Sequence, residues 1–190
     1  GGQAKYRLGF EPLLPGVRHV PFGDLRAIEA AITERTAGIL LEPIQGEGGI
    51  RLPPPGFFDG VRELCEKYGC LMLLDEVQSG VGRTGSLFAY EAEGVAPDIM
   101  TLAKGLGGGL PIGAMLTTDK IGSKLPYGSH GSTFGGNPVA CAAAQVVMDT
   151  VSEPVFLSRV AELGNHMLGR LKDMASLYKR ICVGARGRGL

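Results

Sequence analysis

The sequence has no excess of charge of either sign. Its 190 residues contain 19 Lys and Arg and 19 Asp and Glu, so the formal net charge is zero. Proteins that bind nucleic acid or anionic membrane through broad electrostatic contact carry a basic excess. The balance therefore argues against nucleic acid and membrane surfaces as partners.

Long apolar runs and paired cysteines are also missing. No apolar run approaches the roughly 18 residues that a membrane-spanning helix needs, so we expect no transmembrane helix. The four cysteines, Cys65, Cys70, Cys141 and Cys182, form no CxxC pair and show no metal-ligand spacing. We therefore expect reduced, buried thiols in a cytoplasmic protein, and no metal site.

Glycine, by contrast, is abundant. It accounts for 31 of the 190 residues, which is about twice its average share. The glycines lie in loops between apolar segments and follow no collagen-like period. This distribution suggests backbone that packs close to a ligand.

Apolar runs alternate with helical patterns along the chain. The patterns predict strands at 37–42, 70–75, 98–104 and 112–118, with a further short strand possible at 17–20. They predict helices at 24–32, 57–68, 87–91, 137–151 and 155–177. Asp24 suits the N-cap of the first helix and Gly69 the end of the second. The β-loop-α-β order of residues 37–75 is the unit of a parallel sheet.

Three predicted strands end in a charged residue that a flexible loop follows: Glu42, Asp75 and Lys104. Any one of them alone would more often be a solvated strand end. In open α/β sheets, however, ligands bind outside the carboxyl ends of the strands. Three charges in such positions, each before a glycine-containing loop, indicate one shared site.

Lys104 is the most informative member of this group. The glycines after it leave no side chains to crowd its amine, which could form a Schiff base with an aldehyde. A carboxylate at a neighbouring strand end, such as Asp75, would keep a pyridine nitrogen protonated. Pyridoxal phosphate requires this combination. Gln78 could hydrogen-bond the phenolic oxygen of that cofactor, and Val77 could press on its ring.

Four ordered motifs resemble the class-III (ornithine-type) aminotransferases of pyridoxal-phosphate fold type I. They cover nearly the whole chain and read ILLEPIQGEGG, LLDEVQSGVGRTG, LAKGLGGGLPIGAM and GSHGSTFGGNP. The resemblance implies an α/β fold with a mostly parallel sheet flanked by helices, a pyridoxal phosphate cofactor and a homodimer with shared active sites. It implies transfer of an amino group from an amino acid to a 2-oxo acid. The last two motifs are most similar to the branch that moves the δ-amino group of N-acetylornithine to 2-oxoglutarate, in arginine biosynthesis.

The resemblance also implies roles for single residues. Lys104 matches the Schiff-base lysine that shuttles the substrate proton, Asp75 the pyridinium partner, and Gln78 the phenolic-oxygen contact. Glu76 and Val77 belong to the same cofactor-binding segment.

Four further residues match substrate or partner contacts of the family. Thr133 matches a threonine that reaches the phosphate of the partner subunit's cofactor, and Ser132 a substrate contact beside it. Glu47 matches a glutamate that pairs with an arginine and switches between amino-acid and keto-acid substrates. Glu42 lies near the same pocket. Ser132 and Thr133 could instead be ordinary turn residues, and Glu47 a solvated loop acid.

The resemblance divides the chain near residue 150. Residues 1–150 would form the central to C-terminal part of a large pyridoxal-phosphate-binding domain. Residues 151–190 would form a connecting helix and the start of a small C-terminal α/β domain. Family segments on both sides are absent, including the phosphate loop and the substrate-binding arginines. We therefore expect a fragment that has little or no transaminase activity alone.

Other functions remain open at this point. Another class-III aminotransferase, acting on ornithine, succinylornithine or 4-aminobutyrate, would share Lys104 and Asp75. A non-catalytic relative of the fold would have no need to retain both residues. A nucleotide-binding α/β module is a weaker alternative, because the sequence has neither a Walker loop nor GxGxxG.

Overall fold

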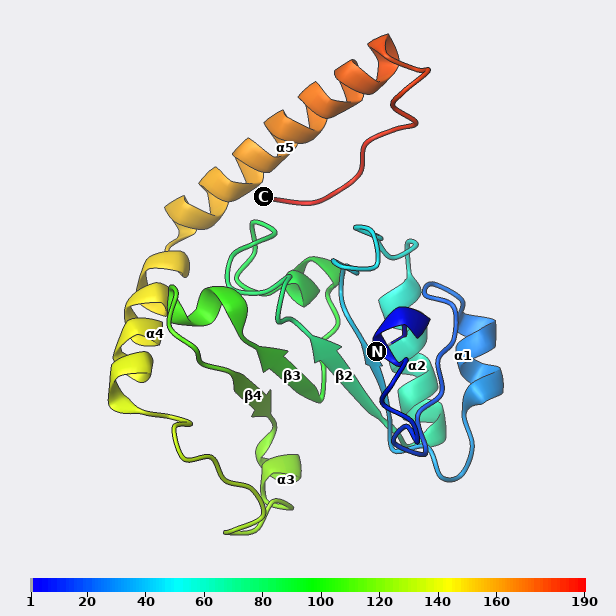
Figure 1. Cartoon of the computed structure of the whole chain (residues 1–190), viewed down its shortest axis with the longest axis vertical. Coiled ribbons are helices and arrows are strands. Elements are labelled where there is room, and N and C mark those ends of the chain that lie inside the picture. Colours follow the sequence, from blue (N-terminus) through cyan, green and yellow to red (C-terminus); the bar gives the residue numbers. More distant parts are fainter. Residues whose placement is uncertain (1) are drawn as a thin grey trace.

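The computed structural model describes residues 2–190, and a four-stranded sheet lies at its centre (Figure 1). The strands, in the spatial order β1-β2-β3-β4, are Gly38–Leu41, Leu71–Asp75, Ile99–Leu102 and Ala114–Thr117. The first three are parallel, and β4 is antiparallel to β3. The short segment between β3 and β4 has no room for the crossover helix that a parallel return needs. The predicted, mostly parallel sheet is thus confirmed.

Helices flank this sheet, and their ends follow the signals in the sequence. The α-helices are α1 (Leu25–Ala31), α2 (Phe57–Tyr68), α3 (Asp119–Gly122), α4 (Pro138–Val151) and α5 (Pro154–Leu177). Three short 3-10 helices are η1 (Ala4–Tyr6), η2 (Ala89–Glu93) and η3 (Lys104–Gly107). The Asp24 carboxylate accepts from the Ala27 amide at 2.9 Å and caps α1. Gly69, at φ 66°, ends α2 as predicted.

The core lies between one face of the sheet and the helices. In β2, Met72 and Leu74 are buried against α2, while the alternate positions are only partly buried. A second cluster joins Met100 and Leu102 of β3 to Ala144 of α4. Because side chains alternate across a strand, Asp75 lies on the opposite face from Leu74. That face carries the less buried positions of β2 and β3.

An ion pair ties α2 to the start of β3. Asp98 Oδ2 accepts from Arg62 Nη2 at 2.7 Å and from the Met72 amide at 2.8 Å. Partial burial raises the pKa of Asp98, but the hydrogen bonds from Arg62 and Met72 outweigh it, and the net pKa is lowered. The carboxylate is therefore held in its charged form.

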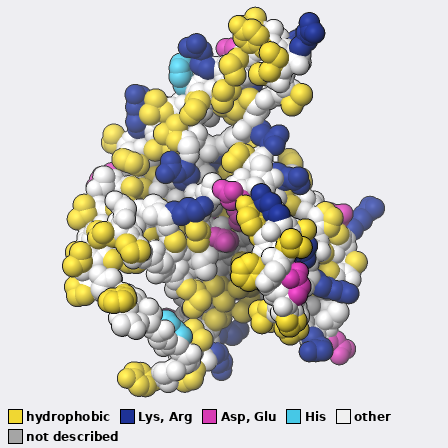
Figure 2. All heavy atoms as spheres, viewed as in Figure 1, with side chains coloured by type: hydrophobic (Ala, Val, Ile, Leu, Met, Phe, Trp, Pro, Cys, Tyr) yellow, Lys and Arg dark blue, Asp and Glu magenta, His cyan; other side chains and the backbone are white. Residues whose placement is uncertain are grey.

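The helix α5 extends away from the sheet, and the C-terminal segment returns beside it toward the body (Figure 1). Partly exposed hydrophobic side chains follow its length, including Leu163, Met167, Leu171 and Met174. Figure 2 shows hydrophobic side chains gathered at this end of the molecule. Within residues 2–190, no single helix is long and apolar enough to cross a membrane. The bent pair α4 and α5, at 72°, meets that test only when both helices are counted together.

Three expectations from the sequence need correction. Residues 17–20 form no strand, because a strand needs a hydrogen-bonding partner and these exposed residues pair with none in the described chain. The helix expected at 87–91 is the 3-10 helix η2, displaced by two residues. Cys65 and Cys70 are buried free thiols as predicted, but Cys141 is exposed and Cys182 is partly exposed.

Candidate active site

The charged strand ends predicted from the sequence meet at one edge of the sheet. Glu42 directly follows β1, Asp75 is the last residue of β2, and the pairing of Leu41 with Leu74 puts both acids at the same level. Lys104 lies two residues beyond β3, where it begins η3. Parallel strands present their carboxyl ends together, which is where ligands bind in such sheets.

The Lys104 amine has a defined partner in the structure. Its Nζ donates to Oε1 of Gln78 at 2.9 Å. The backbone of Lys104 adopts φ 42°, a left-handed conformation that a non-glycine residue rarely takes. Gln78 in turn lies against the backbone of Gly46: an added Cβ there would come within 2.2 Å of Oε1. Gly46 therefore leaves the space in which Gln78 meets Lys104.

The Asp75 carboxylate is half-buried and retains one free oxygen. Its Oδ1 accepts from the Val77 amide at 3.0 Å, which fixes the carboxylate at the end of β2. For Oδ2, no hydrogen-bond partner is found in the described chain. This oxygen can accept a hydrogen bond from an N–H or O–H group of a bound molecule.

Glu76 has different surroundings, because it points to the buried side of β2. The residue is fully buried, with 0% exposure. Oε2 accepts from Ser79 Oγ at 2.6 Å and Oε1 from the Tyr90 amide at 2.9 Å. Burial raises the pKa of Glu76, although the hydrogen bonds from Ser79 and from the Tyr90 and Ala89 amides oppose the shift. Both carboxylate oxygens of Glu76 thus stabilise the local fold, one at the turn after β2 and the other at the start of η2.

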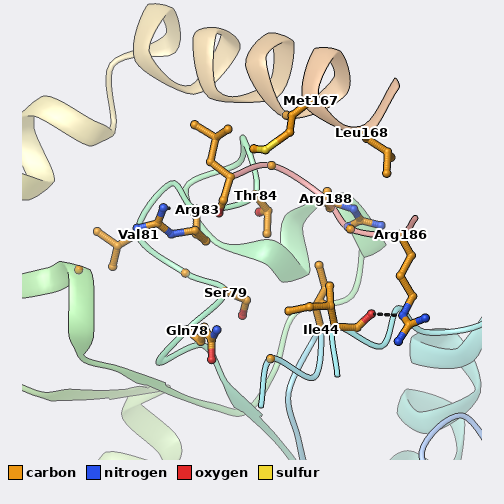
Figure 3. A pocket seen from close by; sticks show the side chains of 18 of the residues that line it. Ile44, Gln78, Ser79, Val81, Arg83, Thr84, Met167, Leu168, Arg186 and Arg188 are labelled. Carbon is orange, nitrogen blue, oxygen red and sulfur yellow. Dashed lines mark hydrogen bonds between the residues drawn. The ribbon is translucent and has the colours of Figure 1, made fainter. Parts of the chain in front are cut away.

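A cavity of about 510 Å³ opens beside Gln78 and Lys104 (Figure 3). Its walls come from the loop after β1, the loop after β2, helix α5 and the C-terminal segment. In Figure 3, Met167 and Leu168 extend toward it from α5, with Gln78 and Ser79 on the opposite side.

Left-handed backbone gathers around this cavity. In the described chain, three non-glycine residues have φ near +50°: Ile50, Val81 and Lys104. All three line the cavity. Such conformations cost free energy and are typical of functional sites. Their concentration at one cavity is a sign of function that no sequence pattern revealed.

The cavity wall is cationic. Besides Lys104, its lining includes Arg83, Arg186 and Arg188, and no carboxylate side chain belongs to the part of the lining that the structure describes. Arg188 pairs with Glu93 at 2.8 Å. A wall of this charge suits anionic ligands such as carboxylates and phosphates. Sequence reasoning missed Arg186 and Arg188; the alternation of Arg and Gly in residues 184–190 was the available signal.

The remaining predicted residues are distributed over two regions. Glu42 Oε2 accepts from the Gly46 amide at 3.0 Å, so it supports the segment 45–51, which we call the glycine loop. Glu47 is exposed within that loop. Ser132 and Thr133 lie in the exposed loop before α4. In Figure 1 that loop lies at the opposite end of the sheet from the carboxyl ends of β2 and β3. A single chain does not bring Ser132 and Thr133 to Lys104.

Residues 1–190 match the family profile described as Aminotransferase class-III. The acetylornithine aminotransferase of Myxococcus xanthus is 52% identical over 190 residues, which is 100% of this chain and 47% of that protein. The succinylornithine transaminase of Yersinia enterocolitica is 50% identical over 190 residues, again 100% of this chain and 46% of that protein.

Solved structures show the same similarity. An ornithine aminotransferase from Toxoplasma gondii superposes with a TM-score of 0.94 at 36% identity, covering 100% of this chain and 45% of that chain. That structure is described as having partial occupancy of pyridoxal phosphate at its active site. The superposition confirms the fold class that the four motifs imply. The chain spans about half the length of the relatives it matches.

Proposed function

Because this chain belongs to the class-III aminotransferases, we propose that it is the lysine-bearing part of a pyridoxal-phosphate-dependent transaminase. One observation carries the proposal. The Lys104 amine, on a left-handed backbone at the carboxyl edge of a parallel sheet, lies 2.9 Å from the Gln78 amide oxygen. A lysine side chain held in this way beside a cationic cavity suits reversible attachment of an aldehyde.

The residues present fit the cofactor of this family. Lys104 would hold its aldehyde, the free Asp75 Oδ2 its ring nitrogen, Gln78 its phenolic oxygen and Val77 its ring face. When bound, pyridoxal phosphate supplies an electron-accepting ring that stabilises negative charge on the substrate carbon. The Lys104 Nζ takes the proton from that carbon and returns one later, as general base and then general acid. Asp75 keeps the ring nitrogen charged, because opposite charges favour the ionised pair.

For the substrates, we propose transfer of the δ-amino group of N-acetylornithine to 2-oxoglutarate, as in arginine biosynthesis. The 52% identity to a protein named acetylornithine aminotransferase supports this choice. Arg83 on the cationic wall of the cavity suits substrates that carry carboxylates. A protein named succinylornithine transaminase is 50% identical, so the succinyl substrate is the second candidate. Comparing kcat/KM for acetylornithine, succinylornithine, ornithine and 4-aminobutyrate separates these activities.

Glu42, Glu47 and Ser132 are proposed substrate-side residues. Glu47 is exposed on the glycine loop, where it is available to pair with an arginine. Glu42 supports that loop through the Gly46 amide. For Glu76, its buried hydrogen bonds favour a contribution to the cofactor site through the fold of the segment that follows β2.

The proposed assembly is a cytoplasmic homodimer with shared active sites. Thr133 lies in an exposed loop away from the cavity of its own chain, which supports a role at the phosphate of the partner subunit's cofactor. Residues 1–150 are proposed to belong to the large domain. Residues 151–190 would be the connecting helix and the start of a small domain, since α5 extends away from the sheet (Figure 1).

Borohydride reduction tests the proposed function. The full-length protein is incubated with pyridoxal phosphate, reduced, digested and mapped by mass spectrometry. We expect the cofactor on Lys104, and no label at this position in Lys104→Ala. Labelling spread over surface lysines, with no preference for Lys104, would favour a non-catalytic relative of the fold.

A further inference from the structure

The glycine loop is folded tightly back on itself. Gln45 and Arg51 form an antiparallel bridge, with both N–H···O distances at 3.0 Å. The Gly46 carbonyl accepts from the Gly49 and Ile50 amides at 3.0 and 3.1 Å. The turn requires φ 105° at Gly49 and φ 50° at Ile50. A β-branched residue in this conformation is an outlier, so the turn depends on outside contacts to persist.

Arg186 supplies such contacts from the C-terminal segment. Its Nη2 donates to the Gly49 carbonyl at 2.6 Å, and its Nε donates to the Ile50 carbonyl at 2.9 Å. Figure 3 marks one hydrogen bond from Arg186 toward this loop. A longer contact of 3.2 Å joins Nε to Gly49. These carbonyls belong to the two residues with left-handed backbone. Hydrogen bonds from a charged guanidinium are stronger than those between neutral groups.

The first residues of the same loop lie against the candidate cofactor site. The backbone of Gly46 is so close to Gln78 that an added Cβ would lie 2.2 Å from Oε1. That oxygen is the one that accepts from Lys104 at 2.9 Å. A displaced loop would therefore change where Gln78 can lie, and with it the position of the Lys104 amine.

We infer that Arg186 is a positioning residue for the site: it holds the glycine loop against Gln78 and thereby sets the position of the Lys104 amine. The inference rests on the proposed function. It links the C-terminal segment to the glycine loop, through a contact between Arg186 and Ile50, which are 136 positions apart, and through that loop to the proposed catalytic lysine. Arg186 acts through backbone carbonyls and through Gln78, without contacting Lys104.

The test uses the full-length protein with bound pyridoxal phosphate and the variant Arg186→Ala. We expect the Gly49 and Ile50 amides to exchange hydrogen about tenfold faster than in wild type. The pH midpoint of the visible absorption of lysine-bound cofactor should shift by about half a unit or more, because the partner of the Lys104 amine is displaced. kcat should fall about 10- to 100-fold, with a smaller change in KM for the amino donor.

Three further variants make the test specific. Arg188→Ala is the matched control, because Arg188 lies in the same segment but donates to Glu93 instead of the loop. It should leave exchange at Gly49 and Ile50 unchanged. Arg186→Lys, with one cationic head in place of a planar fork, should restore only part of the protection. Gly46→Ala crowds Gln78 directly and should shift the same pH midpoint, which keeps the test decisive if Arg186→Ala does not fold.

The outcomes separate the two proposals. An Arg186→Ala protein with wild-type exchange and a wild-type pH midpoint overturns the role of Arg186, even if its melting temperature falls. If that variant does not fold, an unmoved midpoint in Gly46→Ala does the same. A wild-type protein that never carries cofactor on Lys104 overturns the proposed function itself.

Discussion

Asp75 and Glu76 are neighbours in sequence, but their side chains lie on opposite faces of β2. Asp75 is half-buried; its Oδ1 accepts from the Val77 amide, and its Oδ2 has no hydrogen-bond partner among residues 2–190. Glu76 is fully buried, and both of its oxygens accept hydrogen bonds from the chain. A charge that remains available to a ligand differs in function from one that the fold already uses.

For Asp75→Ala in the full-length enzyme, we expect kcat/KM to fall on the order of 100- to 1000-fold, because no anion then holds the proton on the cofactor ring. Asp75→Asn should lose nearly as much, since an amide carries no charge. The melting temperature without cofactor should change little in Asp75→Asn. Glu63→Ala, an exposed acid on α2, is the control. A loss below fivefold in Asp75→Ala would contradict the assignment.

Replacing Glu76 should act on stability. Glu76→Ala leaves the Ser79 hydroxyl and the Tyr90 amide without their acceptor, and we expect a loss of about 2–4 kcal/mol in unfolding free energy. Glu76→Gln retains an acceptor for Tyr90 and a donor for Ser79, so it should cost no more than about 1 kcal/mol. The measurement is thermal unfolding of the cofactor-free protein.

The raised pKa of Glu76 adds a dependence on pH. Above the ordinary value of 4.5, the folded state keeps a proton that the unfolded state has lost. Stability therefore falls as the pH rises from about 4.5 through the folded pKa, and then levels off. Glu76→Gln should lack this decline. The melting temperatures of wild type and Glu76→Gln are measured against pH. If both decline by the same amount above pH 4.5, Glu76 is not the source of the decline.

Sequence patterns could predict that Lys104 and Asp75 lie at strand ends on one edge of the sheet, because a charge after an apolar strand stands out. They could not place Glu76, because the residues before it are apolar on both faces of β2. Without visible alternation between Leu73 and Leu74, the sequence does not show which acid faces the core. The structure shows that Glu76 is the acid on the core side, because Met72 and Leu74 on that side pack against α2.

At the scale of elements, the pairing of α2 with β3 depends on Asp98. Asp98→Asn keeps an acceptor for the Met72 amide but leaves Arg62 partly buried without its counter-charge. We expect the variant to lose about 1–3 kcal/mol of unfolding free energy at pH 7. The control is Glu29→Gln, which removes the exposed pair with Lys67. It should lower the melting temperature less, because exposed pairs contribute little.

The lowered pKa of Asp98 predicts the pH range in which the ion pair with Arg62 is lost. A carboxyl whose folded pKa lies below its unfolded value contributes stability above the unfolded value, here 3.8. That contribution disappears as the pH falls through the still lower folded pKa. The melting temperatures of wild type and Asp98→Asn should therefore converge below about pH 3.8. A difference that persists unchanged at pH 2.5 would contradict this explanation.

Local signals in the sequence predicted the ends of the helices better than the contacts between segments far apart in the chain. Asp24, Gly69 and Asn137 mark helix ends through side-chain or backbone geometry that depends only on near neighbours. The contact between Arg186 and Ile50 joins residues 136 positions apart, and no local pattern encodes it. The strand expected at 17–20 failed for a related reason: a strand exists only with its partner.

At the scale of the whole molecule, the position of the loop before α4 is the main constraint on assembly. Ser132 and Thr133 are exposed there, and Tyr127 and Phe134 in the same loop are also exposed. In this chain the loop lies at the opposite end of the sheet from the carboxyl end of β3, which Lys104 follows (Figure 1). A role for Thr133 at the cofactor phosphate therefore requires a second copy of the chain.

Mixing two defective enzymes tests that requirement. Lys104→Ala lacks the proposed catalytic amine, and Thr133→Ala lacks the proposed phosphate contact. If Thr133 serves the partner's cofactor, each mixed dimer has one site with both residues intact and one site with neither. After full subunit exchange, about a quarter of the wild-type number of sites should be active, because about half of the dimers are mixed. If Thr133 instead serves the cofactor of its own chain, no mixed site is complete, and activity should stay at the level of the Thr133→Ala sites. Activity of the unmixed variants, measured at the same total concentration, provides the baseline.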